Sequence, residues 1–402
     1  MKEEVFQRLT GATPEHFFSA PDLERHHKLI ERSGLLPGDL VDRDAIDFLI
    51  SHPAMSYPFI RIVNHGREIL PEHYLRRPID AEFRLVDPDR VLSFYRNGST
   101  IIFQKSHLWT AKLARLTGSL QRSLLALVNC NIYVTPAGSK GFAPHFDTHD
   151  VFIYQVSGEK IWNIYDAPRE LPLESESLSA KESGDYLHRR PSVELTLRQG
   201  NLLYVPKGLV HDTFTRSTES VHVTIGIFPP RGVDLLRAVT DQASQRPFFR
   251  RAAFTSRESG STGAGVSQRI VDEFADVTTE LLGGEALSRF REERFLTVPT
   301  QEARGRFSDL LSVETMQLDT RMHRRASIPF QLSPGTPGKI ELRFYDKRVV
   351  FPAFVEDDLK FVAGSQGTFS VGDIAGRLDD AGRLVLAKTL IREGFLTLQP
   401  VD

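Results

Sequence analysis

Two stretches of the sequence decide the fold: GFAPHFDTHDVF at residues 141–152 and NLLYVPKGLVHDTF at residues 201–214. Each contains a run of strand-forming residues next to a turn with Gly or Pro. The first places His145 and Asp147 two positions apart, and the second places His211 just after a Lys-Gly turn. If these strands close on one another, the three polar side chains meet in one pocket.

The sequence around these stretches is typical of an all-β domain. Between residues 131 and 230, short strand-like runs are separated by Gly, Pro and Ser turns: NIYVTP, HFDTHDVFIYQV, KIWNIY, VELTL, NLLYVP and VHVTIGIF. Many short strands with such turns favour a sandwich or a barrel. An acidic, serine-containing stretch at 169–184 interrupts the set, and we expect it to be a surface loop.

The residues before this region predict a mixed α/β lead-in. Short helical patterns occur at 23–29 and 44–50. The segment VLSFYRNGSTIIF at 91–103 places an Asn-Gly pair between two β-rich runs, which predicts a hairpin. Residues 108–127 carry apolar side chains at three- and four-residue steps and predict a helix.

The residues after 230 predict helices and a small α+β module. The predicted elements are, in order, a helix at 233–244, a flexible SGSTGAG stretch at 259–265, a helix at 266–282, a hairpin at 340–351 with its turn at 346–347, and helices at 371–378 and 383–393. Two strands with a few short helices suggest a small α+β or winged-helix module at the end of the chain.

The composition is that of a globular protein. The chain has 402 residues, of which 40% are hydrophobic and 25% charged, and 50 Lys+Arg against 52 Asp+Glu give a formal net charge of -2. This length suggests two or three domains, and this composition excludes a disordered chain. A charge so close to zero provides no long-range field that would attract nucleic acid or an anionic membrane.

The sequence also limits the compartment and the partners. Cys130 is the one cysteine, so an internal disulfide is impossible. The first residues lack the basic-then-apolar order of an export signal, and no apolar run approaches the roughly 18 to 20 residues that cross a bilayer. We therefore expect a cytoplasmic protein without a membrane partner. The basic residues of 301–402 are offset by acidic ones, so direct DNA binding is not favoured.

His145, Asp147 and His211 are the candidate metal ligands. On a strand, residues i and i+2 project to the same face about 6 to 7 Å apart, so an imidazole and a carboxylate can converge on one ion. Two imidazoles and one carboxylate on one face of an ion leave three positions open, as in non-haem Fe(II) oxygenases. Taken singly, each residue has a plainer interpretation, such as a surface histidine beside an aspartate or a histidine that caps a loop.

Lys160 is the candidate anion-binding residue. It begins the run KIWNIY after a predicted turn at 157–159. Because strand side chains alternate, Lys160 shares a face with Trp162, and that face is internal if Trp162 belongs to the core. A buried, unpaired ammonium is costly, so an inward lysine predicts an anion such as a dicarboxylic cosubstrate. The alternative is that a lysine after Gly-Glu stays solvated.

These residues together resemble the JmjC oxygenases of the cupin superfamily. The resemblance rests on the HxD pair at His145 and Asp147, on Lys160 at 15 positions after His145, and on the YxPxGxxH run at 204–211. More closely, NIYVTPAGSKGFAPHFDTHDVFIYQVSGEKIWNIY resembles the ribosomal-oxygenase branch, which hydroxylates side chains of ribosomal proteins. The motif-bearing resemblance covers roughly residues 90–230. It implies an α+β fold with a double-stranded β-helix core.

The resemblance implies roles for individual residues. The metal ligands His145, Asp147 and His211 would hold Fe(II). Lys160 would pair with the distal carboxylate of 2-oxoglutarate, which is consumed together with O2. The family lines its cosubstrate pocket at three further positions, which here are Asn131, Tyr133 and Thr224; such residues on strands are also often structural. Four other histidines are expected at the surface or behind the ligands: His26, His27, His149 and His188.

The order of parts extends the resemblance to the whole chain. That branch follows its cupin domain with a helical dimerisation region and a winged-helix domain, which implies an oxygenase domain at 1–230, a helical dimerisation region at 231–300 and a winged-helix-like domain at 301–402. It also implies a homodimer and a protein or peptide substrate. Arginine and histidine of ribosomal proteins are the precedents.

Other hypotheses remain open at this point. An alternative target is a biosynthetic peptide or a free amino acid, since the branch also resembles bacterial enzymes that hydroxylate these. A non-oxygenase cupin that binds Zn or Mn is a second class, but such a protein would not need Lys160. A regulator whose cupin senses a metabolite and whose C-terminal module binds DNA is a third class, and the mixed charge of that module argues against it.

Overall fold

The computed structural model describes residues 4–19, 23–77, 84–251, 263–283, 287, 305–325, 328–345, 347–365 and 367–398, with the side chains of 4 and 263–267 excepted. Residues 259–262 of the expected flexible stretch and residue 346 of the expected turn lie outside this part of the chain. The chain divides into two compact units, Met1–Phe228 and Pro229–Asp402.

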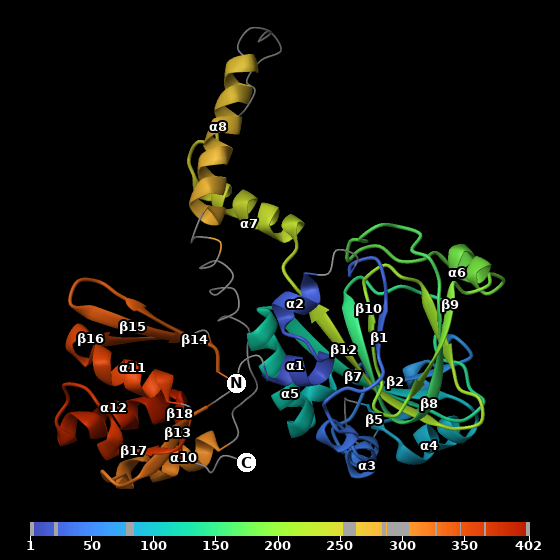
Figure 1. Ribbon diagram of the computed structural model, residues 1–402, viewed down its shortest axis with the longest axis horizontal. Helices are drawn as coiled ribbons and strands as arrows, with labels where there is room; N and C mark the ends of the chain where they lie inside the picture. The colour runs from blue at the N-terminus through green and yellow to red at the C-terminus, as the bar shows by residue number, and fades with distance from the viewer. Residues whose placement is uncertain are drawn as a thin grey trace. The chain divides into compact units, whose positions relative to one another are not determined.

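The first unit is built around a β-sandwich whose two sheets share one strand, β8 (Asp150–Ile164). The first half of β8 lies between β10 (Leu202–Val205) and β12 (Ser220–Phe228). Its second half lies between β9 (Val193–Arg198) and β11 (His211–Phe214). The strand therefore belongs to both the larger and the smaller sheet. Figure 1 labels β8 among the strands of the first unit.

The larger sheet is antiparallel throughout, in the order β1-β10-β8-β12-β7-β6-β2-β3. Its remaining strands are β1 (Lys28–Ile30), β2 (Ile60–Asn64), β3 (Arg67–Glu68), β6 (Thr100–Phe103) and β7 (Leu127–Thr135), and a separate pair is formed by β4 (Leu75–Arg76) and β5 (Leu85–Val86). This confirms the run of short strands predicted within residues 131–230, although the helix α6 (Ala180–Tyr186) interrupts it.

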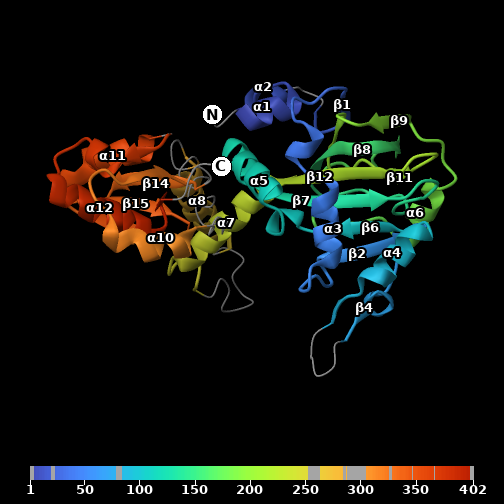
Figure 2. The same ribbon diagram turned by 90° about the horizontal axis from the view of Figure 1, so that it is seen from below.

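Alternation along the strands separates an outer core from an inner cavity. On β7, Val128, Cys130 and Ile132 belong to the main hydrophobic core, in which α1 (Glu4–Thr10) and α5 (Ala111–Leu124) also pack. The residues between them therefore face the space between the sheets. Figure 2 shows the strands of this sheet from below. The helices thus cover one face of the sheet and leave the other for a site.

The further helices of the first unit are α2 (Pro14–Phe18), α3 (Arg43–Ser51), α4 (Pro88–Arg96) and α6 (Ala180–Tyr186), with 3-10 turns at η1 (Pro37–Asp39), η2 (Pro71–His73) and η3 (Ser106–Leu108). The helices expected at 44–50 and 108–127 are confirmed as α3 and α5. The helix expected at 23–29 is wrong, because that segment is a turn followed by β1.

The hairpin expected at 91–103 is also wrong. The first run is the helix α4, and only the second run is a strand, β6. Asn97 ends α4 as its C-cap, and Gly98 follows with a φ of 87°. A left-handed glycine after the last turn is the usual way to end a helix, and the same Asn-Gly pair also suits a two-residue hairpin. The Asn-Gly pair correctly indicated that the chain reverses its direction here. It did not indicate whether the reversal ends a helix or joins two strands.

Two expectations about the loops need correction. The turn expected at 157–159 is a bend within β8, where Gly158 has a φ of 63°. A side chain at Gly158 would overlap the backbone oxygen of Glu219, so only glycine fits there. The stretch 169–184 is not wholly a loop, since α6 begins at Ala180 with a capping box between Ser179 and Glu182.

The second unit contains helices and two small antiparallel sheets. Its elements are α7 (Gly232–Gln245), α8 (Gly263–Leu282), α10 (Arg306–Ser312), η4 (Val313–Thr315), β13 (Arg321–Arg324), β14 (Phe330–Pro334), β15 (Lys339–Phe344), β16 (Lys347–Pro352), η5 (Ala353–Val355), α11 (Glu356–Gly364), β17 (Phe369–Ser370), η6 (Val371–Asp373), α12 (Asp380–Glu393) and β18 (Leu396–Thr397). One sheet has the order β14-β15-β16 and the other β17-β13-β18. None of the helices in the described part of the chain is long and apolar enough to cross a bilayer.

Most of the elements expected after residue 230 are confirmed. The helices at 233–244, 266–282 and 383–393 are α7, α8 and α12, and the hairpin at 340–351 is β15–β16. The helix expected at 371–378 is wrong, because only the short 3-10 turn η6 forms there. Buried Asp358 accepts hydrogen bonds from the N–H groups of Arg377 and Leu378, and it holds this segment in a loop.

Candidate active site

Two metal-ligand candidates are fixed opposite each other by their own backbones. His145 donates its N–H to the oxygen of His211 at 3.1 Å, and His211 donates its N–H to the oxygen of His145 at 2.8 Å. His145 lies before β8, not on it, and an isolated bridge joins it to His211 at the start of β11. The expectation that His145 and Asp147 share a strand is therefore wrong, although both side chains reach the same cavity.

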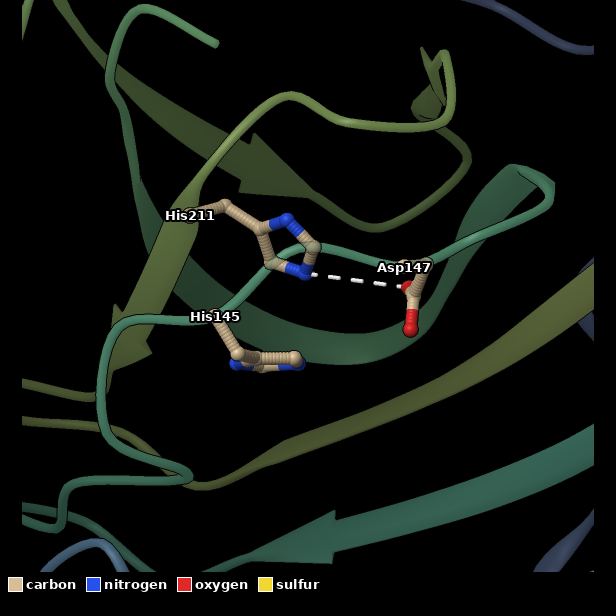
Figure 3. Close-up of side chains that lie close together, drawn as sticks. All are labelled: His145, Asp147 and His211. Atoms are coloured by element: carbon tan, nitrogen blue, oxygen red, sulfur yellow. Dashed lines mark ion pairs between the residues drawn. The ribbon is translucent and has the colours of Figure 1, made fainter. Parts of the chain in front are cut away.

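The side chains of His145, Asp147 and His211 meet around one space (Figure 3). One possible ligand atom from each lies within 4.8 Å of the other two. Nε2 of His211 is 3.9 Å from Oδ2 of Asp147. Among the described residues, this is the one group of three or more His, Cys, Asp or Glu side chains with such spacing. The three donors that lie far apart in the sequence are thus brought together.

The hydrogen bonds of the two imidazoles determine which nitrogen faces the space. Nδ1 of His145 is 2.9 Å from the backbone oxygen of Ala143, and Nδ1 of His211 is 3.1 Å from that of Leu209. A carbonyl oxygen only accepts, so each Nδ1 carries the proton and each Nε2 presents its lone pair. This is how metal-binding histidines are commonly oriented. The residues present therefore fit a divalent cation.

The charge states also suit a cation. Burial, followed by the neighbouring His145, lowers the pKa of His211 to about 4, so its imidazole is neutral at neutral pH. Burial works against ionisation of Asp147, but the neighbouring histidines, His211 first, hold the pKa of its carboxyl below the usual value. Neutral imidazoles and an ionised carboxylate are the forms that ligate a metal.

Lys160 lies in the same cavity as the three candidate ligands. Its side chain is inward, as expected from Trp162, and the residue is 1% exposed. Nζ donates to Oγ1 of Thr135 at 2.9 Å, and no carboxylate of the described residues forms an ion pair with it. Burial lowers the pKa of Lys160 to about 7. An ammonium in this position is stabilised by an anionic ligand.

The three weaker candidates are placed differently. Tyr133 and Thr224 line the cavity from neighbouring strands, β7 and β12. Asn131 pairs with Thr224 across these strands but does not line the cavity. Its Oδ1 accepts the N–H of Lys105 at 2.9 Å, where the chain turns left-handed with a φ of 49°. Asn131 therefore has a structural contact, whatever else it binds.

His222 lines the cavity as well, and sequence reasoning gave it no role. His222 lies two residues before Thr224 on the inner face of β12, and its ring stacks on Tyr133 with centroids 4.7 Å apart and planes 6° apart. The alternation of VHVTIGIF is the signal that places it there. Of the histidines expected outside the site, His149 stacks on Phe228 at 4.1 Å.

The stretch 169–184 supports the ligand segment from behind. Phe146, between two candidate ligands, packs in a buried cluster with Tyr165, Tyr186 and Val210. The hydroxyl of Ser183 donates to the backbone oxygen of Pro144 at 2.7 Å. Within the stretch 169–184, Leu178 packs against this cluster and Ser183 makes this hydrogen bond. The stretch lies at the surface, as expected, and these two residues also support the segment around His145.

This strand order and this cavity define a class of protein. A sandwich in which two His and one Asp meet beside a buried lysine resembles the double-stranded β-helix of JmjC proteins. The family model of the JmjC domain matches residues 105–235, so this part of the chain is similar to a JmjC domain.

Curated relatives agree over the same region. The "bifunctional lysine-specific demethylase and histidyl-hydroxylase NO66" of Drosophila persimilis is 35% identical over 159 residues, which are 39% of this chain and 22% of that protein. The protein of the same name from Dictyostelium discoideum is 36% identical over 146 residues, which are 35% of this chain and 27% of that protein. The chain thus spans about a quarter or less of the length of these relatives.

Solved structures show a likeness over nearly the whole chain. Escherichia coli ycfD has a TM-score of 0.55 at 16% identity, and the match covers 95% of this chain and 97% of that one. The ribosomal oxygenase YcfD of Escherichia coli in complex with cobalt and 2-oxoglutarate has a TM-score of 0.54 at 13% identity, covering 95% and 96%. Because both sequence identities are low, the likeness to these structures establishes the fold alone.

Proposed function

We propose that the protein is an Fe(II)- and 2-oxoglutarate-dependent hydroxylase that acts on a side chain of a protein or peptide. The observation that carries the proposal is the presence, in one cavity, of the His145–Asp147–His211 group and an inward Lys160 without a carboxylate partner. The three metal-ligand candidates would hold the ion that the 2-oxoacid end of 2-oxoglutarate chelates. Lys160 would bind the carboxylate at the other end of the same molecule.

The ligand set fits iron by its chemistry. When bound, Fe(II) together with 2-oxoglutarate and O2 supplies the oxidation that places a hydroxyl on a C–H bond of the substrate and yields succinate and CO2. His145, Asp147 and His211 would bind the ion on one face and leave the other face open. Their Nδ1 contacts with backbone carbonyls keep both Nε2 atoms directed at the ion.

Lys160 would orient the cosubstrate. A hydrogen bond from an ammonium to a carboxylate is about twice as strong as one between neutral groups. The lysine is positioned by Thr135 before any ligand arrives, so little order has to be created on binding. Val151, Ile153 and Trp162 line the same cavity and restrict water around the ligand.

The nature of the substrate is proposed from the relatives. NO66 proteins are named as histidyl-hydroxylases and lysine-specific demethylases, and YcfD is described as a ribosomal oxygenase. Arg or His of a ribosomal protein is therefore the first class of target to examine. A biosynthetic peptide or a free amino acid is the alternative. The match of residues 105–235 to the JmjC domain is compatible with each of these targets, and experiment distinguishes them.

The remaining parts of the chain are included in the proposal. We propose an oxygenase domain at 1–230, a helical dimerisation region at 231–300 that makes the protein a homodimer, and a winged-helix-like domain at 301–402, all in the cytoplasm. Two observations support this division: the first unit ends at Phe228, and α7 and α8 share a small core of Val239, Ala243 and Val277.

The activity is tested by turnover without the prime substrate. We expect the pure protein, supplied with Fe(II), ascorbate and 2-oxoglutarate, to form succinate slowly. If succinate does not form and 2-oxoglutarate does not bind, the proposal is wrong, and a Zn- or Mn-binding cupin without oxygenase activity becomes the better hypothesis. The target is then sought by comparing intact masses of proteins and peptides from cells with and without the gene, for a gain of one oxygen atom.

A further inference from the structure

His222 is held in one orientation beside Lys160. The residue is 2% exposed and lines the same cavity. One face of its imidazole lies flat on Tyr133, and Trp162 meets it edge-on, with ring centroids 5.7 Å apart and planes 73° apart. Contacts on a face and on an edge fix the plane of the ring. The position and the plane of this ring are therefore set by packing.

The imidazole of His222 has unused hydrogen-bonding capacity. Its Nδ1 is buried and has no partner among the described residues. Burial, followed by the positive charge of Lys160, lowers the pKa of His222 well below the usual value, so the ring is neutral. A neutral imidazole has one donor and one acceptor nitrogen. Buried polar groups are rarely left unpaired, and an unpaired one points to a missing partner.

The same wall of the cavity has an excess of donors. Lys160 has three N–H groups, of which Thr135 accepts one. Nε1 of Trp162 is likewise buried and without a partner among the described residues. Trp162 has donor capacity only, and a carboxylate accepts at about four lone-pair positions. An anionic ligand with several acceptor oxygens satisfies such a wall, whereas a water molecule satisfies only part of it.

Trp162 contacts both the metal-ligand group and His222. Its ring centroid lies 5.6 Å from that of His211 and 5.7 Å from that of His222. Trp162 is buried in the core between the sheets, so this spacing is rigid. One end of a ligand would lie at the metal-ligand group and the other at the donors of Lys160 and His222. Because the spacing between these two places is rigid, only a ligand of matching length reaches both.

We propose that His222 donates a second hydrogen bond to the anionic group that Lys160 binds, and that His222 and Trp162 together select a dicarboxylate of one chain length. The inference rests on the proposed function, because it assumes that 2-oxoglutarate is the ligand. It adds a specificity residue that the sequence motifs do not include. A five-carbon 2-oxoacid is expected to bind better than its four-carbon and six-carbon homologues, oxaloacetate and 2-oxoadipate.

The test measures binding of 2-oxoglutarate to the Co(II)-loaded protein by calorimetry, without turnover. His222→Phe keeps a ring to stack on Tyr133 and removes the donor. We expect its affinity for 2-oxoglutarate to fall about 10-fold or more, as for loss of a hydrogen bond to a charged group. His222→Asn, which returns an N–H near the position of Nδ1, should recover part of this loss. The affinity for Co(II) should be the same in all variants.

The chain-length series provides a second readout. The wild-type protein should prefer 2-oxoglutarate to both homologues, and His222→Phe should reduce that preference. His188→Phe, a change at an exposed histidine, is the matched control and should change nothing. If His222→Phe binds 2-oxoglutarate as well as the wild-type protein does, the inference is wrong and the proposed function stands. If the Co(II)-loaded wild-type protein binds no 2-oxoglutarate, the proposed function itself fails, and the inference with it.

Discussion

Lys160 donates from Nζ to Oγ1 of Thr135 at 2.9 Å, so a buried ammonium faces a neutral hydroxyl. Thr100 donates to the same oxygen at 3.1 Å, and thus two donors share one acceptor. A hydroxyl cannot neutralise the charge of the lysine. The charge is therefore available to a ligand, which gives the first two predictions.

Lys160→Ala should weaken the binding of 2-oxoglutarate strongly. Removing one partner of a buried, hydrogen-bonded ion pair costs on the order of 2 to 5 kcal/mol, which is roughly 30-fold to several thousand-fold in affinity. Co(II) binding should stay near normal, because Lys160 is not one of the metal-ligand group. Calorimetry on the Co(II)-loaded protein measures both. Lys181→Ala, at an exposed position of α6, is the control, and equal affinities for 2-oxoglutarate in wild type and Lys160→Ala would refute the assigned role.

The stability of the ligand-free protein should rise with pH above neutrality. The pKa of Lys160 is about 7 in the folded protein, against a usual value of 10.5. Between these values the unfolded chain binds more protons than the folded one, so the free energy of unfolding increases with pH, by at most about 1.4 kcal/mol per pH unit. Below pH 7 both states are protonated, and the full cost of burying the charge is present.

Lys160→Met is the matched variant for this pH effect. Both tryptophans, Trp109 and Trp162, lie in the first unit, so their fluorescence in urea follows the unfolding of that unit. The variant should be more stable than the wild type at pH 7, and the difference should shrink toward pH 10. Parallel pH curves for the two proteins would contradict a charged, buried Lys160.

Metal binding should stabilise the first unit through the three-residue group. A ligand that binds only the folded state at 1,000 times its Kd stabilises it by about 4 kcal/mol. Addition of Co(II) should therefore raise the urea midpoint of the fluorescence transition, and EDTA should reverse this. Asp147→Ala should abolish the effect and His188→Ala should not. A Co(II) effect that persists in Asp147→Ala would place the metal elsewhere.

The contacts behind the metal-ligand group should affect metal affinity. Tyr186→Ala removes a ring from the cluster that holds Phe146 between His145 and Asp147. Changes in the groups that orient metal ligands commonly cost 10- to 100-fold in affinity, and we expect at least about 10-fold here. Competition with a Co(II)-binding dye measures this. Tyr186→Phe retains the ring and should be much milder, and Glu174→Gln, at an exposed position, should have no effect.

A buried ion pair is important for the second unit. Nη2 of Arg325 is 2.8 Å from Oδ2 of Asp309, and both residues are nearly inaccessible. Oδ1 of Asp309 also accepts the N–H of Leu398 at 2.9 Å. Asp309→Ala leaves a buried guanidinium without this carboxylate and should destabilise the unit by about 3 to 5 kcal/mol. Circular dichroism in urea measures the loss, and Asp357→Ala, in an exposed pair with Arg377, should cost less than about 1 kcal/mol.

The chemistry of the site was more predictable from the sequence than its local structure. HxD and the later histidine indicated the metal-ligand group, and the alternation around Trp162 indicated that Lys160 points inward. The strand expected to carry His145 is absent, because a backbone bridge to His211 holds that residue instead. Such a bridge joins residues far apart in the sequence, and no local pattern predicts it.

Two of the errors in the predicted elements share a physical cause. Asn97–Gly98 and Gly158 are both places where the backbone needs a glycine, and local sequence does not distinguish a helix end, a hairpin turn and a bend within a strand. Sequence reasoning gave His222 no role, because its contact with Tyr133 crosses from β12 to β7. The bend at Gly158 and the contact of His222 both depend on pairing between strands, which a local sequence pattern does not reveal.

The passage of β8 through both sheets has a consequence for how the sequence can change. Lys160 lies beyond Gly158, and Ile164 at the end of the same strand pairs with His211. Losing one residue between Gly158 and Lys160 would turn the lysine to the opposite side and shift its partners by one position. Proteins that descend from this one should therefore keep the length of the span from Gly158 to Lys160, with no insertion or deletion, even where single residues are replaced.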